Sequence, residues 1–105
     1  MPDDDVFRWL MDWYARQCNG EWEHTYGVLI DTLDNPGWTI KIDLVETELA
    51  DVPFGEVAHN LDADTGWWIC KVDGGKFVAA CGPGDLLAAL DVFRTWASAH
   101  PARST

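Results

Sequence analysis

Basic residues are scarce in this sequence. Seven Lys and Arg stand against eighteen Asp and Glu, which gives a formal net charge of −11. This charge repels the phosphates of nucleic acids and the headgroups of anionic lipids, so neither nucleic acid nor a membrane is expected as a partner. Hydrophobic residues still make up 48% of the chain and seven residues are Trp, which excludes the acidic disordered class. We expect a folded protein with a basic macromolecular partner.

Long apolar runs and paired cysteines are also missing. No stretch of eighteen apolar residues occurs, and the chain starts with Pro2 and three acids at residues 3–5, the reverse of the basic start of a secretory signal. The three cysteines, Cys18, Cys70 and Cys81, are odd in number and have no CxxC spacing, so a disulfide framework and a zinc site are not expected. We expect a cytoplasmic protein without metal or cofactor.

Two segments have the apolar periodicity of amphipathic helices. Residues 3–17 repeat apolar side chains along one stripe, and an Asn-Gly pair follows, which is a common helix end. Asp85 is the predicted N-cap of a second helix, whose apolar residues repeat at intervals of three and four as far as His100. The sequence therefore predicts one helix near each end of the chain.

Four segments alternate apolar and polar residues, as strands do. Residues 26–33 and 38–44 flank an Asn-Pro-Gly sequence at 35–37, which predicts a hairpin with a type II turn. Residues 67–72 and 76–81 are joined by Asp-Gly-Gly and predict a second hairpin. The sequence between the hairpins is predicted to be mostly loop, with one short strand near residues 56–60.

The order of these elements predicts the fold class. A chain of 105 residues is expected to form a single domain, residues 1–105, with one modest core. We predict an α+β fold in the order α-β-β-loop-β-β-α: a four- to five-stranded antiparallel sheet with the N-terminal and C-terminal helices packed on one face. The other face should mix aliphatic, aromatic and charged groups. Because this face and the sheet edges could support pairing, the protein is expected to be a monomer or a weak homodimer.

The acidic residues are concentrated rather than spread evenly. Between Ile42 and Cys70 there is no Lys or Arg, and this acidic stretch contains Asp43, Glu46, Glu48, Asp51, Glu56, Asp62 and Asp64. A surface of one sign raises the rate of association with a partner of the opposite sign. The acidic stretch is therefore a candidate binding surface for a basic partner.

One short stretch has the components of catalytic chemistry. Cys18, Glu21, Glu23 and His24 provide a thiol, carboxylates and an imidazole, which nucleophilic and general-base catalysis use. Their spacing also suits a Cys that ends the helical stripe and a Glu and a His that cap or pair locally. A small thiol-dependent or Glu/His-dependent enzyme is therefore an alternative, and no catalytic residue is assigned.

The seven tryptophans fall into two groups. Trp9, Trp13 and Trp96 have helical core spacing. The others are expected in a loop, at a turn exit or on a strand: Trp22, Trp38, Trp67 and Trp68. Neighbouring residues of a strand point to opposite faces, so one of the adjacent pair should face away from the helices. Exposed Trp side chains are frequent anchors of protein interfaces.

The strings WEH at 22–24 and TLDNPGW at 32–38 resemble the immunity protein 53 family of bacterial polymorphic toxin systems. The similarity is strongest over residues 13–47. It implies a small cytoplasmic α+β protein without catalytic activity that protects its producer by binding a cognate toxin domain. One departure is Glu21, where the family more often has Asp, a change that keeps the charge.

The resemblance supplies no contact residues, so these are argued from charge and expected exposure. The predicted toxin-binding residues, besides the acidic stretch, are Glu21, Trp22, Glu23, His24, Asp34, Asn35, Trp38 and Trp67. The same motifs could instead build turns and pin the first helix to the sheet. An adaptor for a basic partner other than a toxin is a further alternative, which the neighbouring gene would distinguish because an immunity gene lies beside its toxin gene.

Overall fold

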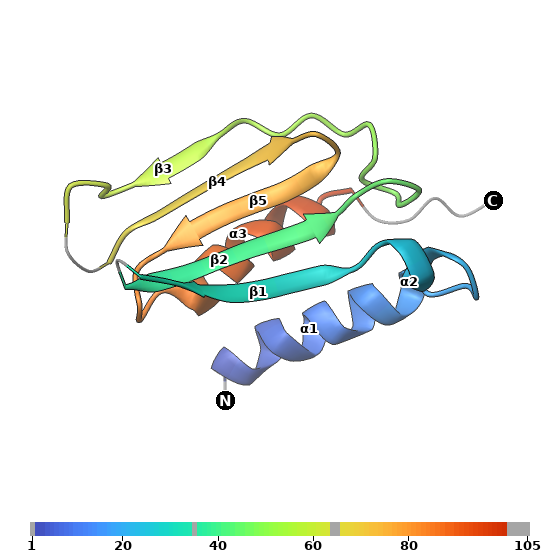
Figure 1. Cartoon of the computed structure of the whole chain (residues 1–105), viewed down its shortest axis with the longest axis horizontal. Helices are drawn as coiled ribbons and strands as arrows, with labels where there is room; N and C mark the ends of the chain where they lie inside the picture. The colour runs from blue at the N-terminus through green and yellow to red at the C-terminus, as the bar shows by residue number, and fades with distance from the viewer. Residues whose placement is uncertain (1, 35, 64–65, 101–105) are drawn as a thin grey trace.

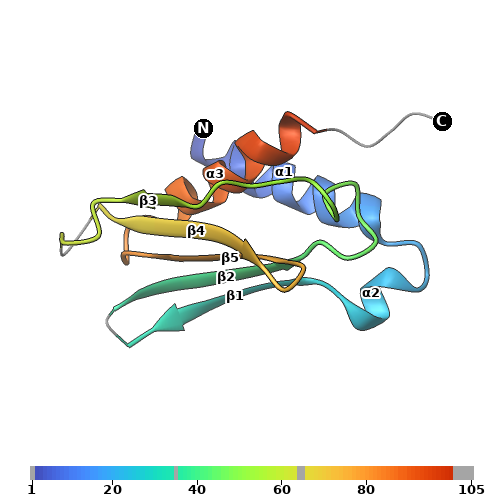
Figure 2. The same ribbon diagram turned by 90° about the horizontal axis from the view of Figure 1, so that it is seen from above.

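A five-stranded antiparallel sheet carries two long helices on one of its faces (Figures 1 and 2). The computed structural model describes residues 2–34, 36–63 and 66–100, with only the backbone for residues 2–5. The elements are α1 (Pro2–Gln17), α2 (Trp22–Thr25), β1 (Val28–Leu33), β2 (Gly37–Asp43), β3 (Val57–His59), β4 (Trp68–Asp73), β5 (Lys76–Cys81) and α3 (Leu86–Ser98). The strands lie in the order β1-β2-β5-β4-β3. The predicted α+β fold is confirmed, and the short helix α2 was not predicted.

The two hairpins close in different ways. In the β4–β5 hairpin Gly74 and Gly75 have φ of 60° and 78°, which a two-residue turn requires and glycine supplies without strain. In the β1–β2 hairpin Leu33 lies opposite Gly37, and Gly37 is not among the glycines with positive φ. The predicted type II turn needs a positive φ at this glycine and is therefore wrong. Asn35 lies outside the described residues.

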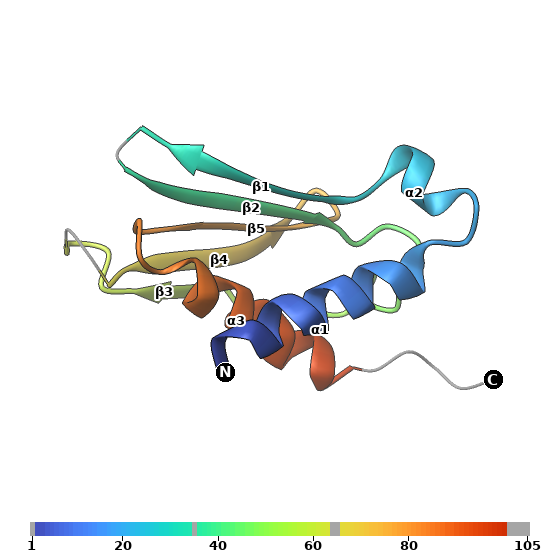
Figure 3. The ribbon, with the colours of Figure 1, turned by 90° about the horizontal axis from the view of Figure 1, so that it is seen from below.

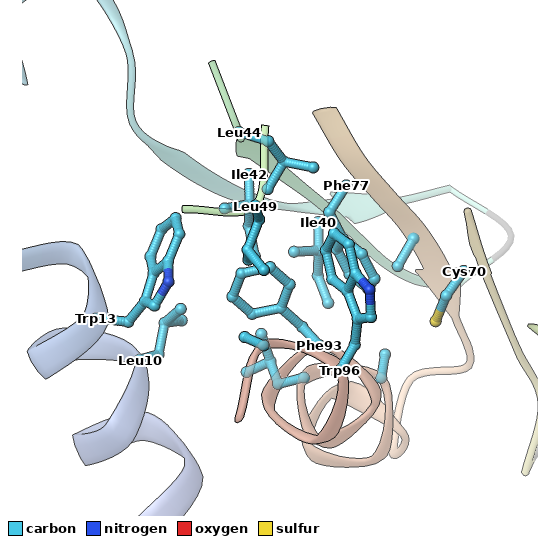
Figure 4. Close-up of a cluster of buried hydrophobic side chains, with 14 of the residues drawn as sticks. Leu10, Trp13, Ile40, Ile42, Leu44, Leu49, Cys70, Phe77, Phe93 and Trp96 are labelled. Carbon is cyan, nitrogen blue, oxygen red and sulfur yellow. The ribbon is translucent and has the colours of Figure 1, made fainter. Parts of the chain in front are cut away.

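The core fills the space between the sheet and the two long helices (Figure 4). Ile40 and Ile42 of β2 face the helices and are fully buried, as the alternation predicted. Trp13 of α1 and Phe93 of α3 meet edge to face, with ring centroids 5.2 Å apart. Such aromatic pairs add to the free energy gained by burial. The core therefore joins both helices to the central strands.

The sheet face away from the helices is balanced in charge. It carries all three lysines of the sequence and three aspartates, which alternate with the buried residues of their strands: Lys41, Lys71, Lys76, Asp31, Asp43 and Asp73. Small and aliphatic side chains such as Val78 and Ala80 lie between them. The predicted aliphatic and charged groups are confirmed, but the predicted aromatic groups are not found among the strand residues of this face, because Trp38, Trp68 and Phe77 lie on the helical side. Because this face is neutral as a whole, the net charge of −11 belongs to the rest of the molecule.

Candidate functional site

The predicted contact residues lie at two opposite ends of the β1–β2 hairpin (Figure 1). Residues 21–24 precede the start of β1, whereas Asp34 follows its end and Trp38 lies beside that end on β2. A strand of six residues spans about 20 Å, since each residue adds about 3.3 Å. The sequence-predicted residues are therefore two separate groups rather than one continuous surface.

Trp22 is a core residue. Its side chain is 2% exposed, its ring lies edge-on to that of Trp13 with centroids 6.3 Å apart, and its Nε1–H donates to the Val45 carbonyl at 2.8 Å. Asn19 fixes the start of α2, because its Oδ1 accepts the backbone N–H groups of Glu21 and Trp22 at 3.0 Å each. Trp22 thus pins α2 to the chain after β2. In this conformation it exposes almost nothing to a partner, so we leave it out of the contact surface.

The Glu23 side chain also forms hydrogen bonds within the fold. Its carboxylate accepts the backbone N–H groups of Asn19 at 3.0 Å and Gly20 at 2.9 Å. Hydrogen bonding from its own backbone amide and from these two amides holds the pKa of the Glu23 carboxyl below its ordinary value. Glu21 and His24 are exposed. The WEH string is therefore largely a structural motif, and its most exposed side chains are His24 and, just before it, Glu21.

At the other end of the hairpin, Trp38 and Trp67 both lie against the loop before α3. The Trp38 Nε1–H donates to the Pro83 carbonyl at 3.0 Å, and the Trp67 carbonyl accepts the Gly82 N–H at 3.0 Å. A Cβ on Gly82 would lie 3.0 Å from Trp67 Nε1, so the absent side chain makes room for the indole. Both Trp side chains are half-buried. Their remaining exposed surface is a candidate contact together with the exposed Asp34.

Asp85 is the N-cap residue of α3, as predicted, but its side chain bonds elsewhere. It stands at the N-cap position of α3 but makes no side-chain bond to that helix. Its Oδ2 instead accepts the backbone N–H groups of Gly66 at 2.9 Å and Trp67 at 3.3 Å. The predicted N-cap position is therefore confirmed, while the Asp85 side chain ties the loop before β4 to the start of α3 instead of capping the helix.

Part of the acidic stretch is used within the fold. Glu48 accepts the Trp13 Nε1–H at 2.8 Å and the Gln17 Nε2–H at 3.1 Å. Asp43 accepts the Gly27 N–H at 3.0 Å and pairs with Lys76 at 3.2 Å. The exposed members are Glu46, Asp51, Glu56 and Asp62, and Asp64 lies outside the described residues.

The buried cysteines are poor nucleophiles. Burial is the main cause, and the neighbouring Cys81 a second cause, that raises the pKa of the Cys70 thiol to about 12. Burial and, to a smaller extent, the nearby Asp85 raise the pKa of the Cys81 thiol to about 11. Cys18 is half-buried and its thiol donates to the Tyr14 carbonyl at 3.3 Å. Within residues 2–34, 36–63 and 66–100, no three His, Cys, Asp or Glu side chains are grouped as a metal site requires.

Alkylation should separate these thiols. Near neutral pH the raised pKa values of Cys70 and Cys81 keep both thiols protonated, and the thiolate is the reactive form. We expect iodoacetamide at about pH 8 to modify Cys18 alone in the native protein and all three cysteines in about 6 M guanidinium chloride. Mass spectrometry counts the adducts. Rapid native modification of Cys81 would contradict this placement and revive the thiol-dependent alternative.

An exposed apolar cluster on α1 and β1 was not predicted from the sequence. Phe7, Met11 and Tyr14 are exposed on α1 and Leu29 is exposed on β1. A groove of about 340 Å³, which we call the α1–β1 groove, is lined by Leu10, Met11, Tyr14, Gly27 and Val28. The sequence does carry a signal for it, because residues 7, 11 and 14 have helical spacing and form a second apolar stripe.

One of three comparisons with known proteins gave a match. The family model described as immunity protein 53 matches residues 7–98, a range that runs from within α1 to the last residue of α3. Searches of curated proteins and of solved structures found no match. In the part of the chain that the structure describes, no helix is long and apolar enough to cross a membrane. The extent of the family match shows that the chain belongs to the immunity protein 53 family.

Proposed function

We propose that this protein protects its producer by binding and neutralising a cognate toxin domain, without catalysing a reaction itself. The observation that carries the proposal is the family match over residues 7–98, nearly the whole fold. The chemistry of the cysteines supports a binding role, since burial raises the pKa of both Cys70 and Cys81. The toxin, not this chain, would supply the active site.

The distribution of charge supports a basic toxin. The open sheet face is neutral, so the full excess of −11 lies on the helices and loops. Near α2 the Trp22–Val45 hydrogen bond brings the exposed Glu21 and Glu46 into the same region. Within residues 2–34, 36–63 and 66–100, neither carboxylate makes a hydrogen bond comparable to those of Glu48, so both can act on an approaching partner. Their field would steer a toxin that presents Lys and Arg.

Co-expression tests the proposed function directly. The toxin encoded beside this gene is expressed in a host with and without the immunity protein, and growth and pull-down are measured. We expect growth to be restored and a stable complex to be recovered, while an immunity protein of another family gives neither. If the wild-type protein restores growth against no neighbouring toxin, the proposed function is wrong.

Salt should slow association more than it speeds dissociation. Steering by exposed carboxylates is screened by salt, whose Debye length falls to a few ångströms at high concentration. We expect the association rate constant to fall about tenfold or more between about 50 mM and about 500 mM NaCl. Stopped-flow mixing with an inactivated toxin domain measures it. Replacing Glu21 and Glu46 by their amides should flatten this dependence, and an unchanged slope would remove the α2 region from the steering surface.

A further inference from the structure

β1 is an open edge of the sheet. Among the described residues it pairs with β2 alone. The Asp43 N–H donates to the Gly27 carbonyl at 3.0 Å, which marks a hydrogen-bonded pair. Such pairs alternate along an antiparallel ladder. The backbone N–H and C=O groups of Val28, Ile30 and Thr32 therefore point away from the sheet, where the described part of the chain provides no further strand.

This edge is less protected than the opposite one. β3, at the other edge, has three residues, whereas β1 has six. Natural edge strands are usually guarded by Lys, Pro, a bulge or short length, and β1 contains neither Lys nor Pro. Asp31 protects part of the strand, because its carboxylate accepts the Thr32 N–H at 2.9 Å. The N–H groups of Val28 and Ile30 remain available for pairing.

An apolar surface lies beside the open edge. Figure 1 shows α1 on the β1 side of the molecule, and Figure 3 shows it in the helical layer. The α1–β1 groove of about 340 Å³ lies between α1 and the start of β1. Met11 at its border is 63% exposed, and Leu29 on the other side of the strand is 55% exposed. Exposed apolar groups that adjoin an unpaired edge are the two components of strand-addition recognition.

We propose that an extended segment of the toxin pairs with β1 as a sixth strand and places apolar side chains in the α1–β1 groove. This docking mode rests on the proposed function and specifies where the toxin binds. Backbone hydrogen bonds to Val28 and Ile30 supply affinity, and the groove supplies specificity, because alternate side chains of the added strand point toward α1.

Charge decides which partner fits this edge. Asp31 lies on the open sheet face and Asp34 follows β1, and both are exposed. An added strand therefore needs Lys or Arg among the side chains that point to the open face near Asp31, and apolar residues near Leu29. A second copy of this chain has the same two aspartates at its edge and a net charge of −11. Two chains that each carry −11 repel one another on approach, so the occupant is a basic strand and not a second copy.

A matched pair of variants tests the site. Met11→Glu puts a charge at the α1–β1 groove, and Leu61→Glu makes the same change beyond β3, at a side chain that is 50% exposed. Both should unfold at the wild-type urea midpoint because both positions are exposed. We expect Met11→Glu to raise the Kd for the inactivated toxin domain about thirtyfold or more and Leu61→Glu to change it less than about twofold. Equal effects of the two variants, with neutralisation by the wild type intact, would overturn the docking site and leave the proposed function standing.

Two further measurements address the edge itself. Asp31→Lys and Asp73→Lys change the net charge equally, and we expect only Asp31→Lys to weaken binding, by about tenfold. Hydrogen exchange of the Ile30 amide should be fast in the free protein and slowed about a hundredfold in the complex, whereas the inward Leu29 amide is protected in both. An unprotected Ile30 amide in the complex, or a free protein that is already a β1-edge dimer, would overturn the proposal. A wild-type protein that neutralises no toxin would overturn the proposed function and the docking mode together.

Discussion

Replacing Trp22 by Ala is expected to destabilise the fold by about 3–5 kcal/mol, the usual loss for a large aromatic residue removed from a core. The indole is 2% exposed, and its Nε1–H bond holds the Val45 carbonyl at 2.8 Å. Small domains have a total stability of about 5–15 kcal/mol, so this variant should be largely unfolded in mild urea. Urea denaturation followed by far-UV circular dichroism measures the change.

A comparison with Trp22→Phe shows how much of the lost stability comes from the hydrogen bond and how much from the buried ring. Phe keeps most of the buried apolar area but loses the bond to the Val45 carbonyl, so it should cost about 1–2 kcal/mol. Trp38→Ala provides the contrast, because Trp38 is only half-buried and should cost less than Trp22→Ala. An unchanged urea midpoint for Trp22→Ala combined with lost toxin affinity would show that Trp22 is a contact residue after all.

Replacing Gly37 by Ala is expected to cost about 2–3 kcal/mol, because an added Cβ would overlap an atom that cannot move freely. The Cβ would overlap the backbone carbonyl oxygen of Cys81, and β2 and β5 would have to separate there. Gly37 is therefore required by the close approach of two strands and not by its own backbone conformation. Thermal unfolding should show a lower Tm by about 8–15 °C for a domain of this size.

Gly55→Ala is the matched control for this prediction. A Cβ at Gly55 meets nothing within 4 Å, and its φ is not positive. The same substitution should therefore change stability by less than about 0.5 kcal/mol and can even stabilise by restricting the unfolded chain. A Gly37→Ala variant as stable as Gly55→Ala would mean that the two strands separate at little cost.

Periodicity made the helices and strands predictable, because each pattern reports which side of an element is buried. The stripe of α1 and the alternation of β2 place Trp13, Ile40 and Ile42 in the core, where the structure has them. Local turn residues were less reliable. Gly37 looked like a turn residue beside Pro36, and only the position of Cys81, 44 residues further along the chain, reveals why glycine is needed.

The candidate site was harder to predict, since it depends on contacts between distant residues. Nothing in the sequence near Trp22 shows that its Nε1–H donates to the Val45 carbonyl. Nor does the sequence show that the Glu48 carboxylate accepts the Trp13 Nε1–H. These side chains looked available because their partners are more than twenty residues away. The exposed apolar stripe of α1 was not predicted as a contact, because in the sequence its residues look like further core residues. Only the placement of the helix shows which stripe is covered.

The position of the lysines has a practical consequence for experiments on this molecule. Lys41, Lys71 and Lys76 all project from the sheet face that the helices leave open. A molecule that is coupled to a sensor chip through a lysine side chain would therefore be tethered by this face and would present the helical layer to the solution. A dye attached in the same way would report on one side of the protein, and a loss of toxin binding after coupling would locate the contact on that side.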